Sequence, residues 1–172
     1  MPADVVRVRW RPVANLALQL AVLAALIAAF FVRLPQVSGL SMEPHIRSGE
    51  YVVINTFAYR LGTPRRGDIV AFRHEGDDRG VFIKRVIGVP GDRIRVERGE
   101  VYVNGRKLDE PYVLHRDDRS FSDVVVPGSA VYVLGDNRAE SEDSRFFGPV
   151  NDDRLIGRAV AGIWPPRMLG GL

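Results

Sequence analysis

A chain of 172 residues is long enough for one ordinary domain with its own core and an additional segment. The net charge is +3, but the arginines alternate with acidic residues and form no basic run, which argues against a nucleic-acid partner. The absence of cysteine excludes disulfides, a thiol nucleophile and a cysteine-ligated zinc site. The three histidines are far apart, so we expect no metal.

The first predicted element is a helix over residues 14–32, a segment without charge. Such a helix would be roughly 28 Å long, close to the thickness of a bilayer's hydrocarbon core. A cleavable signal peptide is the competing interpretation, but its apolar region is normally shorter, and the small-x-small cleavage pattern is poor here. Three arginines precede the segment and only Arg33 follows directly. We therefore predict a cytosolic tail (1–13), a transmembrane anchor (14–32) and an extracytoplasmic domain (33–172).

After residue 33 the pattern changes to short β-rich runs, which Gly, Pro, Asn and Asp separate. The Asn104-Gly105 pair predicts a hairpin turn. Since no helical period longer than two turns follows, we predict one mostly antiparallel β domain. The predicted strands run from Glu50 to Asn55, Asp68 to Phe72, Val81 to Gly88, Arg93 to Glu97, Val101 to Val103, Ala130 to Gly135 and Ile156 to Trp164.

The segment SGLSMEPHI (38–46) contains a candidate nucleophile, Ser41. A chain of nine residues separates it from Val32 and spans at most about 30 Å, so we expect Ser41 near the membrane surface. A serine hydroxyl is a weak nucleophile until a base takes its proton. A Ser-His-Asp set can be drawn with His45, His74 or His115, but the spacing favours none of them. All three lie in loops where we expect surface residues.

A lysine is the more informative candidate base. Only two of the 24 basic residues are lysines, Lys84 and Lys107. Arginine does not lose its proton in proteins, whereas a desolvated lysine can. Lys107 belongs to the predicted hairpin, but in VFIKRVIG the strand period places Lys84 on one face with Phe82 and Val86. An apolar face lowers the pKa of an ammonium group. The alternative is an edge-strand lysine with its head in water.

A third stretch, GDNRAESEDSRFFGPV (135–150), is dense in polar residues directly after a predicted strand. A long hydrated loop is one interpretation. The other is a supporting network, in which Asp143 pairs with Arg145 and Ser141 orients a neutral lysine by a hydrogen bond.

Together these stretches resemble the bacterial type I signal peptidases, serine-lysine endopeptidases that remove leader peptides from exported proteins. The resemblance covers Val37 to Trp164 and the anchor before it. It is carried, in order, by SGLSMEP, RRGDIVAF, FIKRVIGVPGD and GDNRAESEDSR. It implies a mostly β fold: an antiparallel catalytic domain of the signal-peptidase type, preceded by one N-terminal transmembrane α-helix.

The resemblance also implies roles for individual residues. Ser41 is expected to be the nucleophile, Lys84 the general base and Ser141 the serine that positions the lysine, with no cofactor. The Ser41 backbone N–H is expected to be the main oxyanion donor, because Gly39 stands where some members carry a serine that helps. The remaining expected site residues are a salt-bridging set behind the site and two that line the substrate pocket: Asp136, Arg138, Asp143 and Arg145, and Met42 and Ile83.

The expected partners are preprotein signal peptides with small residues at −1 and −3, the lipid bilayer, and the export translocon as a neighbour. Two alternatives stay open. One is a specialised serine-lysine processing peptidase of a conjugation or pilus system, or a self-cleaving repressor, although repressors lack the anchor. The other is a non-catalytic, membrane-tethered β module that binds a partner.

Overall fold

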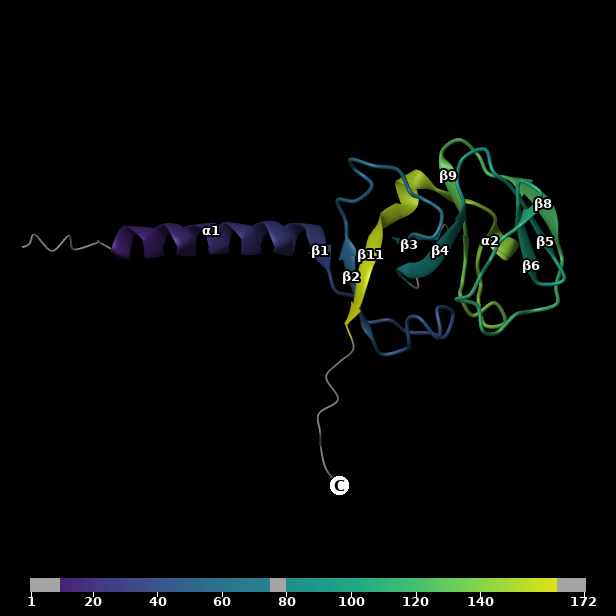
Figure 1. Ribbon diagram of the computed structural model, residues 1–172, viewed down its shortest axis with the longest axis horizontal. Coiled ribbons are helices and arrows are strands. Elements are labelled where there is room, and N and C mark those ends of the chain that lie inside the picture. The colour runs from purple at the N-terminus through teal and green to yellow at the C-terminus, as the bar shows by residue number, and fades with distance from the viewer. Residues whose placement is uncertain (1–9, 75–79, 164–172) are drawn as a thin grey trace, which may run out of the picture. The chain divides into compact units, whose positions relative to one another are not determined.

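The computed structural model describes residues 10–74 and 80–163, and within its long helix not the side chains of residues 27, 28 and 30. The chain divides into two compact units, with the boundary between Val32 and Arg33. The first unit holds one long helix, and the second holds the strands (Figure 1).

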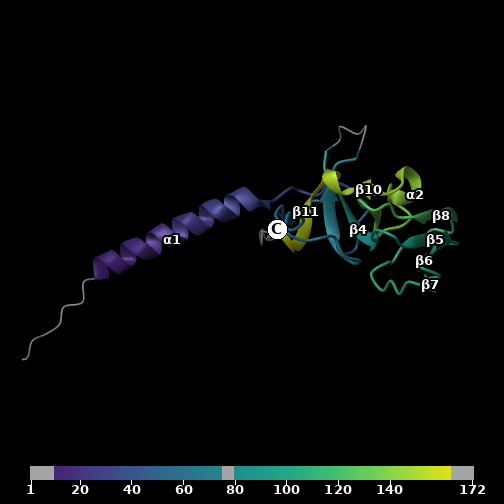
Figure 2. The same ribbon diagram turned by 90° about the horizontal axis from the view of Figure 1, so that it is seen from above.

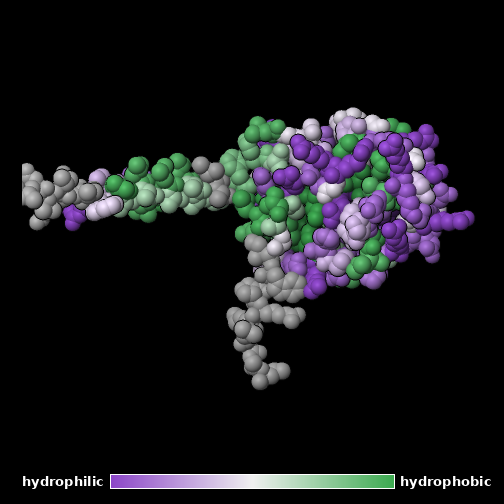
Figure 3. Space-filling model, in the orientation of Figure 1, coloured by the Kyte–Doolittle hydropathy of each residue, from purple (hydrophilic) through white to green (hydrophobic). Residues whose placement is uncertain are grey.

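Helix α1 (Trp10–Phe31) confirms the helix predicted over 14–32, although it begins at Trp10. Leu and Ala dominate its sequence, and both are strong helix formers. Figure 3 shows mostly apolar residues along the helix, and several of its leucines are more than half exposed. Among the residues that the structure describes, no helix combines the length and the apolar character that crossing a bilayer requires.

The second unit contains a large sheet of seven strands in the order β1-β2-β11-β3-β4-β9-β10. All of its pairings given by residue register are antiparallel. The strands are β1 (Val32–Arg33), β2 (Tyr51–Asn55), β3 (Ile69–Phe72), β4 (Phe82–Gly88), β9 (Ala130–Leu134), β10 (Val150–Asn151) and β11 (Leu155–Ile163).

A smaller antiparallel sheet has the order β7-β6-β5-β8. Its strands are β5 (Arg93–Glu97), β6 (Glu100–Val103), β7 (Arg106–Lys107) and β8 (Phe121–Val125). Figure 2 shows these four strands grouped at one end of the β domain. Two short helices complete the domain: α2 (Ser144–Phe147) and the 3-10 turn η1 (Asp152–Arg154).

Three buried clusters form the core. One joins the two sheets, because Ile87 of β4 and Tyr132 of β9 pack with Ile94 and Val96 of β5. A second lies along β3, β4 and β9 and includes Phe72 and Val86. The third contains residues of β2 and β3, and it also takes in Met42 and Ile46 from the loop that precedes β2. The loop carrying Ser41 is thus fastened to the sheet by its own apolar side chains.

The predicted antiparallel β domain is confirmed, and each of the seven predicted strands corresponds to an observed one within about a residue over the described part of the chain. The end predicted at Trp164 lies outside the described residues. The Asn104-Gly105 hairpin is confirmed by the pairing of Val103 with Arg106. Strand β8 was not predicted, because its residues FSDVV are largely exposed and show no clean alternation.

Candidate active site

Ser41 lies in a tight turn, in which hydrogen bonds hold its own carbonyl group and that of the next residue. The Ile46 N–H donates to the Met42 carbonyl at 3.0 Å, and the Asn137 N–H donates to the Ser41 carbonyl at 3.0 Å. Met42 is 2% exposed and packs in the cluster below the turn. These contacts fix the backbone of the turn, in which the Ser41 side chain is partly buried.

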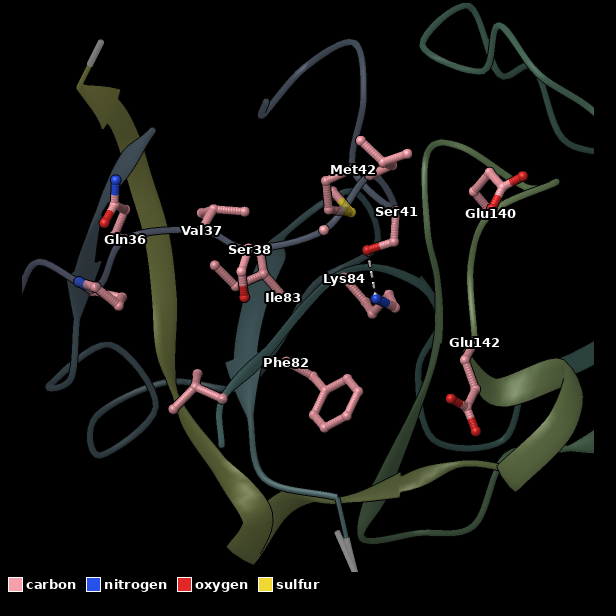
Figure 4. A pocket seen from close by; sticks show the side chains of 14 residues that line it. Gln36, Val37, Ser38, Ser41, Met42, Phe82, Ile83, Lys84, Glu140 and Glu142 are labelled. Carbon is pink, nitrogen blue, oxygen red and sulfur yellow. Dashed lines mark hydrogen bonds between the residues drawn. The ribbon is translucent and has the colours of Figure 1, made fainter. Parts of the chain in front are cut away.

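Lys84 lies in the middle of β4, between β3 and β9, and is 4% exposed. Its Nζ lies 2.7 Å from Ser41 Oγ, the contact drawn as a dashed line in Figure 4. These two residues are 43 positions apart in the sequence, and the structure brings them into direct hydrogen-bond contact.

The Ser41–Lys84 pair opens into a cavity of about 410 Å³. Three segments line this cavity: residues 35–42, residues 81–84, and the glutamates at 140 and 142. Met42 and Ile83, for which the resemblance implies a place in the substrate pocket, are among the lining residues, and so is Gly39. Figure 4 shows Gln36 and Val37 on one side of the pair and the two glutamates on the other.

The environment lowers the pKa of Lys84 from 10.5 to about 8. Burial is the largest cause, because removing water destabilises the ammonium form. The carboxylates of Asp143 and Glu142 act in the opposite direction, and the positive charge of Arg145 lowers the pKa further. An appreciable fraction of Lys84 is therefore neutral near pH 8, the form that can accept a proton.

Asp143 is the centre of the polar network behind Lys84. Its fully buried carboxylate accepts hydrogen bonds from the Gly135 N–H at 3.0 Å and from the Arg145 side chain at 2.8 and 2.9 Å. Arg145 also pairs with Asp117 and donates to the Arg138 carbonyl at 2.8 Å. The pairing of Asp143 with Arg145 is thus present at the start of α2, and the hydrogen bond from the Gly135 N–H connects the Asp143 carboxylate to the end of β9.

The Ser141 hydroxyl donates to Asp143 Oδ2 at 2.7 Å. The described residues show no hydrogen bond between Ser141 and Lys84, although the resemblance implies that Ser141 positions the lysine. The hydroxyl donates its one proton to Asp143, and its effect on the lysine therefore passes through the carboxylate that raises the pKa of Lys84.

The other two members of the expected salt-bridging set pair with residues that the sequence analysis did not single out. Asp136 accepts two hydrogen bonds from Arg85, at 2.8 and 2.7 Å, and Arg138 pairs with the buried Glu110. Arg85 follows Lys84 on β4 and is 9% exposed. A buried arginine requires a carboxylate, but no local pattern indicates which one.

Gly135 allows the turn of Ser41 and the side chain of Ser141 to lie close to the end of β9. A Cβ at this position would lie 2.5 Å from the Ser41 carbonyl oxygen and 2.3 Å from Ser141 Oγ. A side chain here would therefore push the turn that carries Ser41 away from the end of β9. We infer that glycine is required at this junction.

The histidines lie outside this arrangement. His45 is exposed, and its Nδ1 is 3.9 Å from Asp136, which already pairs with Arg85. The His74 ring lies against that of Phe147, with ring centroids 4.4 Å apart and the planes tilted by 35°, and His115 is exposed. No group of three or more potential metal ligands occurs among the described residues.

The order and geometry of these elements agree with comparisons to known proteins. A family profile described as signal peptidase, peptidase S26, matches residues 10–164. The chain belongs to the signal peptidase family, peptidase S26. As a member of this signal peptidase family it is a serine endopeptidase of the signal peptidase I type, which cleaves signal peptides.

Individual signal peptidases show the extent of the similarity. A protein described as probable signal peptidase I-2 of Synechocystis sp. is 39% identical over 154 residues, which cover 87% of this chain and 71% of the relative. Signal peptidase IB of Staphylococcus aureus is 33% identical, with 84% of each chain covered. The crystal structure of a signal peptidase I from Enterococcus faecalis superimposes with a TM-score of 0.50 at 30% identity, covering 58% of this chain and 98% of that one.

Proposed function

We propose that this chain cleaves signal peptides with Ser41 as nucleophile and Lys84 as general base. The observation that carries the proposal is the 2.7 Å contact between Ser41 Oγ and the Nζ of a buried lysine whose pKa is lowered to about 8. A charged lysine donates a hydrogen bond to the serine. Once neutral, its lone pair accepts the serine proton over the same distance.

The reaction then proceeds in two halves. Ser41 Oγ attacks the scissile carbonyl as its proton passes to Lys84, and the resulting ammonium gives that proton to the leaving amine of the mature protein. The leader is left as an ester on Ser41. Lys84, neutral again, takes a proton from a water molecule that attacks the ester. As the ester bond breaks and the leader's carboxyl group is released, Lys84 returns this proton to Ser41 Oγ. The Ser41 backbone N–H is the proposed oxyanion donor, and Gly39 contributes no side chain there.

The substrate is an extended peptide that lies between residues 37–40 and 81–83. Both segments line the cavity beside the pair, and their side chains are largely apolar. Val37, Met42 and Ile83 belong to the same apolar cluster and line the cavity, and this apolar wall suits small apolar residues such as alanine at −1 and −3. The network of Asp136, Arg138, Ser141, Asp143 and Arg145 supports the pair from behind without contacting the substrate.

A cleavage assay tests this function. Purified full-length protein in detergent is incubated with a preprotein that carries alanine at −3 and −1, and the product's new N-terminus is sequenced. We expect cleavage directly after the −1 alanine, and no product from the Ser41→Ala variant. Cleavage by Ser41→Ala at the wild-type rate would contradict the proposed nucleophile, and absence of cleavage by the wild type would contradict the function.

We further propose that α1 holds the chain at the membrane over residues 14–32, with residues 1–13 in the cytosol and 33–172 outside it. The support is the uncharged stretch, the exposed leucines of the helix and the excess of arginines before it. This position places the site next to exported chains as they leave the bilayer and the translocon.

Protease treatment of spheroplasts tests this topology. The β domain should be degraded while a cytosolic marker survives, and the protein should sediment with membranes after an alkaline wash. Release by the wash, or full protection of the β domain in intact spheroplasts, would contradict the placement.

A further inference from the structure

Glu142 lines the catalytic cavity together with Lys84. Figure 4 shows it on the side of the cavity opposite Val37. Its two neighbours in the chain are buried, since Ser141 is 6% exposed and Asp143 is fully buried, whereas Glu142 itself is exposed. The segment 141–143 therefore turns two side chains into the polar network and leaves the glutamate carboxylate at the edge of the cavity.

The backbone on both sides of Glu142 is held in place. The Ser141 carbonyl accepts a hydrogen bond from the Arg145 side chain at 3.2 Å. The Asp143 carbonyl accepts one from the Phe146 N–H at 2.8 Å, at the start of α2. A charged group on such a segment is in position before the reaction begins, so little reorganisation is needed when a charge develops nearby.

Three charged side chains act on the pKa of Lys84, and all of them belong to the segment 142–145. Asp143 and Glu142 raise this pKa, and Arg145 lowers it. Asp143 and Arg145 pair with each other at 2.8 Å, so their opposite effects on the lysine offset one another in part. Glu142 is the other carboxylate that favours the ammonium form.

The remaining elements around Lys84 supply few charges. Strand β3 has no titratable side chain, and β9 has only Tyr132, whose pKa burial raises, so that its hydroxyl stays neutral. The turn that carries the nucleophile contains Glu43 and His45, and His45 Nδ1 lies 3.9 Å from Asp136. The charges that act on the lysine thus come from the segment 142–145.

The reaction places a positive charge on Lys84. As the proton leaves Ser41 Oγ it binds to Nζ, which lies where burial disfavours an ammonium group. A carboxylate at the edge of the cavity lowers the cost of this charge until the proton passes to the leaving amine. The same carboxylate also stabilises the ammonium group before the reaction, so at lower pH it keeps more of the lysine in the inactive form.

We propose that Glu142 is an electrostatic partner of Lys84, whose carboxylate stabilises the ammonium group that forms when the lysine takes the Ser41 proton. It acts through Lys84 and needs no contact with the substrate. The proposal rests on the proposed function, because it takes Lys84 as the general base. Glu142 makes this base stronger, but it reduces the fraction of enzyme in which the base is neutral.

The test compares the pH dependence of kcat/KM for the wild type and Glu142→Gln, both as full-length proteins in detergent at low salt. The substrate is a signal peptide with uncharged residues around the cut, so that its own charges do not contribute. For Glu142→Gln we expect the half-maximal value at a pH lower by about half a unit, and a plateau lower by about twofold. The variant should therefore be faster than the wild type at low pH and slower at high pH. High salt should reduce the shift, because Glu142 is exposed.

Glu140→Gln is the matched control. Glu140 is exposed and lines the same cavity, but the charges that shift the pKa of Lys84 are those of residues 142, 143 and 145. This substitution should leave the midpoint of the profile unchanged. Glu142→Asp keeps the carboxylate and should retain most of the wild-type profile. The midpoint does not depend on the fraction of folded enzyme, so partial unfolding of a variant cannot imitate the shift.

A Glu142→Gln enzyme with the midpoint of the wild type would overturn this role and leave the proposed function intact, even if its plateau were lower. An equal shift in Glu140→Gln would also overturn it, because any charge at the cavity would then have the same effect. A wild-type enzyme that cuts none of the peptides would overturn the role of Glu142 together with the function on which it rests.

Discussion

Replacing Lys84 by arginine is expected to reduce signal-peptide cleavage by about 10²–10⁴-fold, the usual contribution of a positioned general base. Arginine keeps the positive charge and most of the side-chain length, but a guanidinium group does not deprotonate in proteins and cannot accept the Ser41 proton. The substitution therefore tests proton transfer more than charge. The measurement is the initial rate of preprotein cleavage, with circular dichroism to show that the variant is folded.

Lys107→Arg is the matched control. Lys107 pairs with Glu100 on an exposed hairpin, so its substitution should leave the rate unchanged. The wild-type rate should also rise with pH and reach half of its plateau near pH 8, because only neutral Lys84 can act as a base. A folded Lys84→Arg enzyme that retains more than a few per cent of the wild-type rate would refute the serine-lysine mechanism.

Asp143→Ala is expected to lower the free energy of unfolding by about 3–5 kcal/mol, because it leaves the buried guanidinium of Arg145 without its principal partner. The Arg145 side chain is 1% exposed, so water cannot readily replace the carboxylate. The Gly135 N–H and the Ser141 hydroxyl lose their acceptor as well. At about 2–4 °C per kcal/mol for a chain of this size, the melting temperature should fall by roughly 10 °C.

Asp123→Ala is the comparison for the loss of stability expected in Asp143→Ala. Asp123 also accepts a hydrogen bond from an arginine, Arg93, at 2.8 Å, but here the arginine side chain is 66% exposed and the aspartate side chain 35%. An exposed pair contributes about 0–1 kcal/mol, so the melting temperature should change by no more than a few degrees. Equal losses for the two variants in thermal unfolding would contradict a structural role for the network around Asp143.

Much of the β domain could be predicted because its strands are short, β-rich and bounded by turn residues. The pair of Ser41 and Lys84 was also within reach of sequence reasoning. A lysine is conspicuous where arginine supplies almost every other cation, and the four motifs occur in the order of a known family. Residue type and the order of the motifs were therefore enough to identify the two candidate catalytic side chains.

The partners of the buried charges could not be predicted in the same way. Arg138 pairs with Glu110 and Arg85 with Asp136, over 28 and 51 positions of sequence. These contacts depend on how β4 and β9 pack against the loops that follow them, and no sequence periodicity indicates this packing. The hydrogen bond of Ser141 was expected at Lys84 and is found at Asp143, because local geometry decides which of several nearby acceptors a hydroxyl uses.

The burial of Lys84 also makes the stability of the fold depend on protons. A lysine in the unfolded chain keeps its proton up to about pH 10.5, whereas in the folded chain the pKa is about 8. Between these two values the unfolded chain binds more protons, so the folded state gains stability as the pH rises, by about 3 kcal/mol in total. Below pH 8 both states hold the proton, and the folded state bears the full cost of a buried ammonium. In mild acid the folded state is therefore less stable than at high pH. Under the same conditions Lys84 is protonated and cannot act as a base.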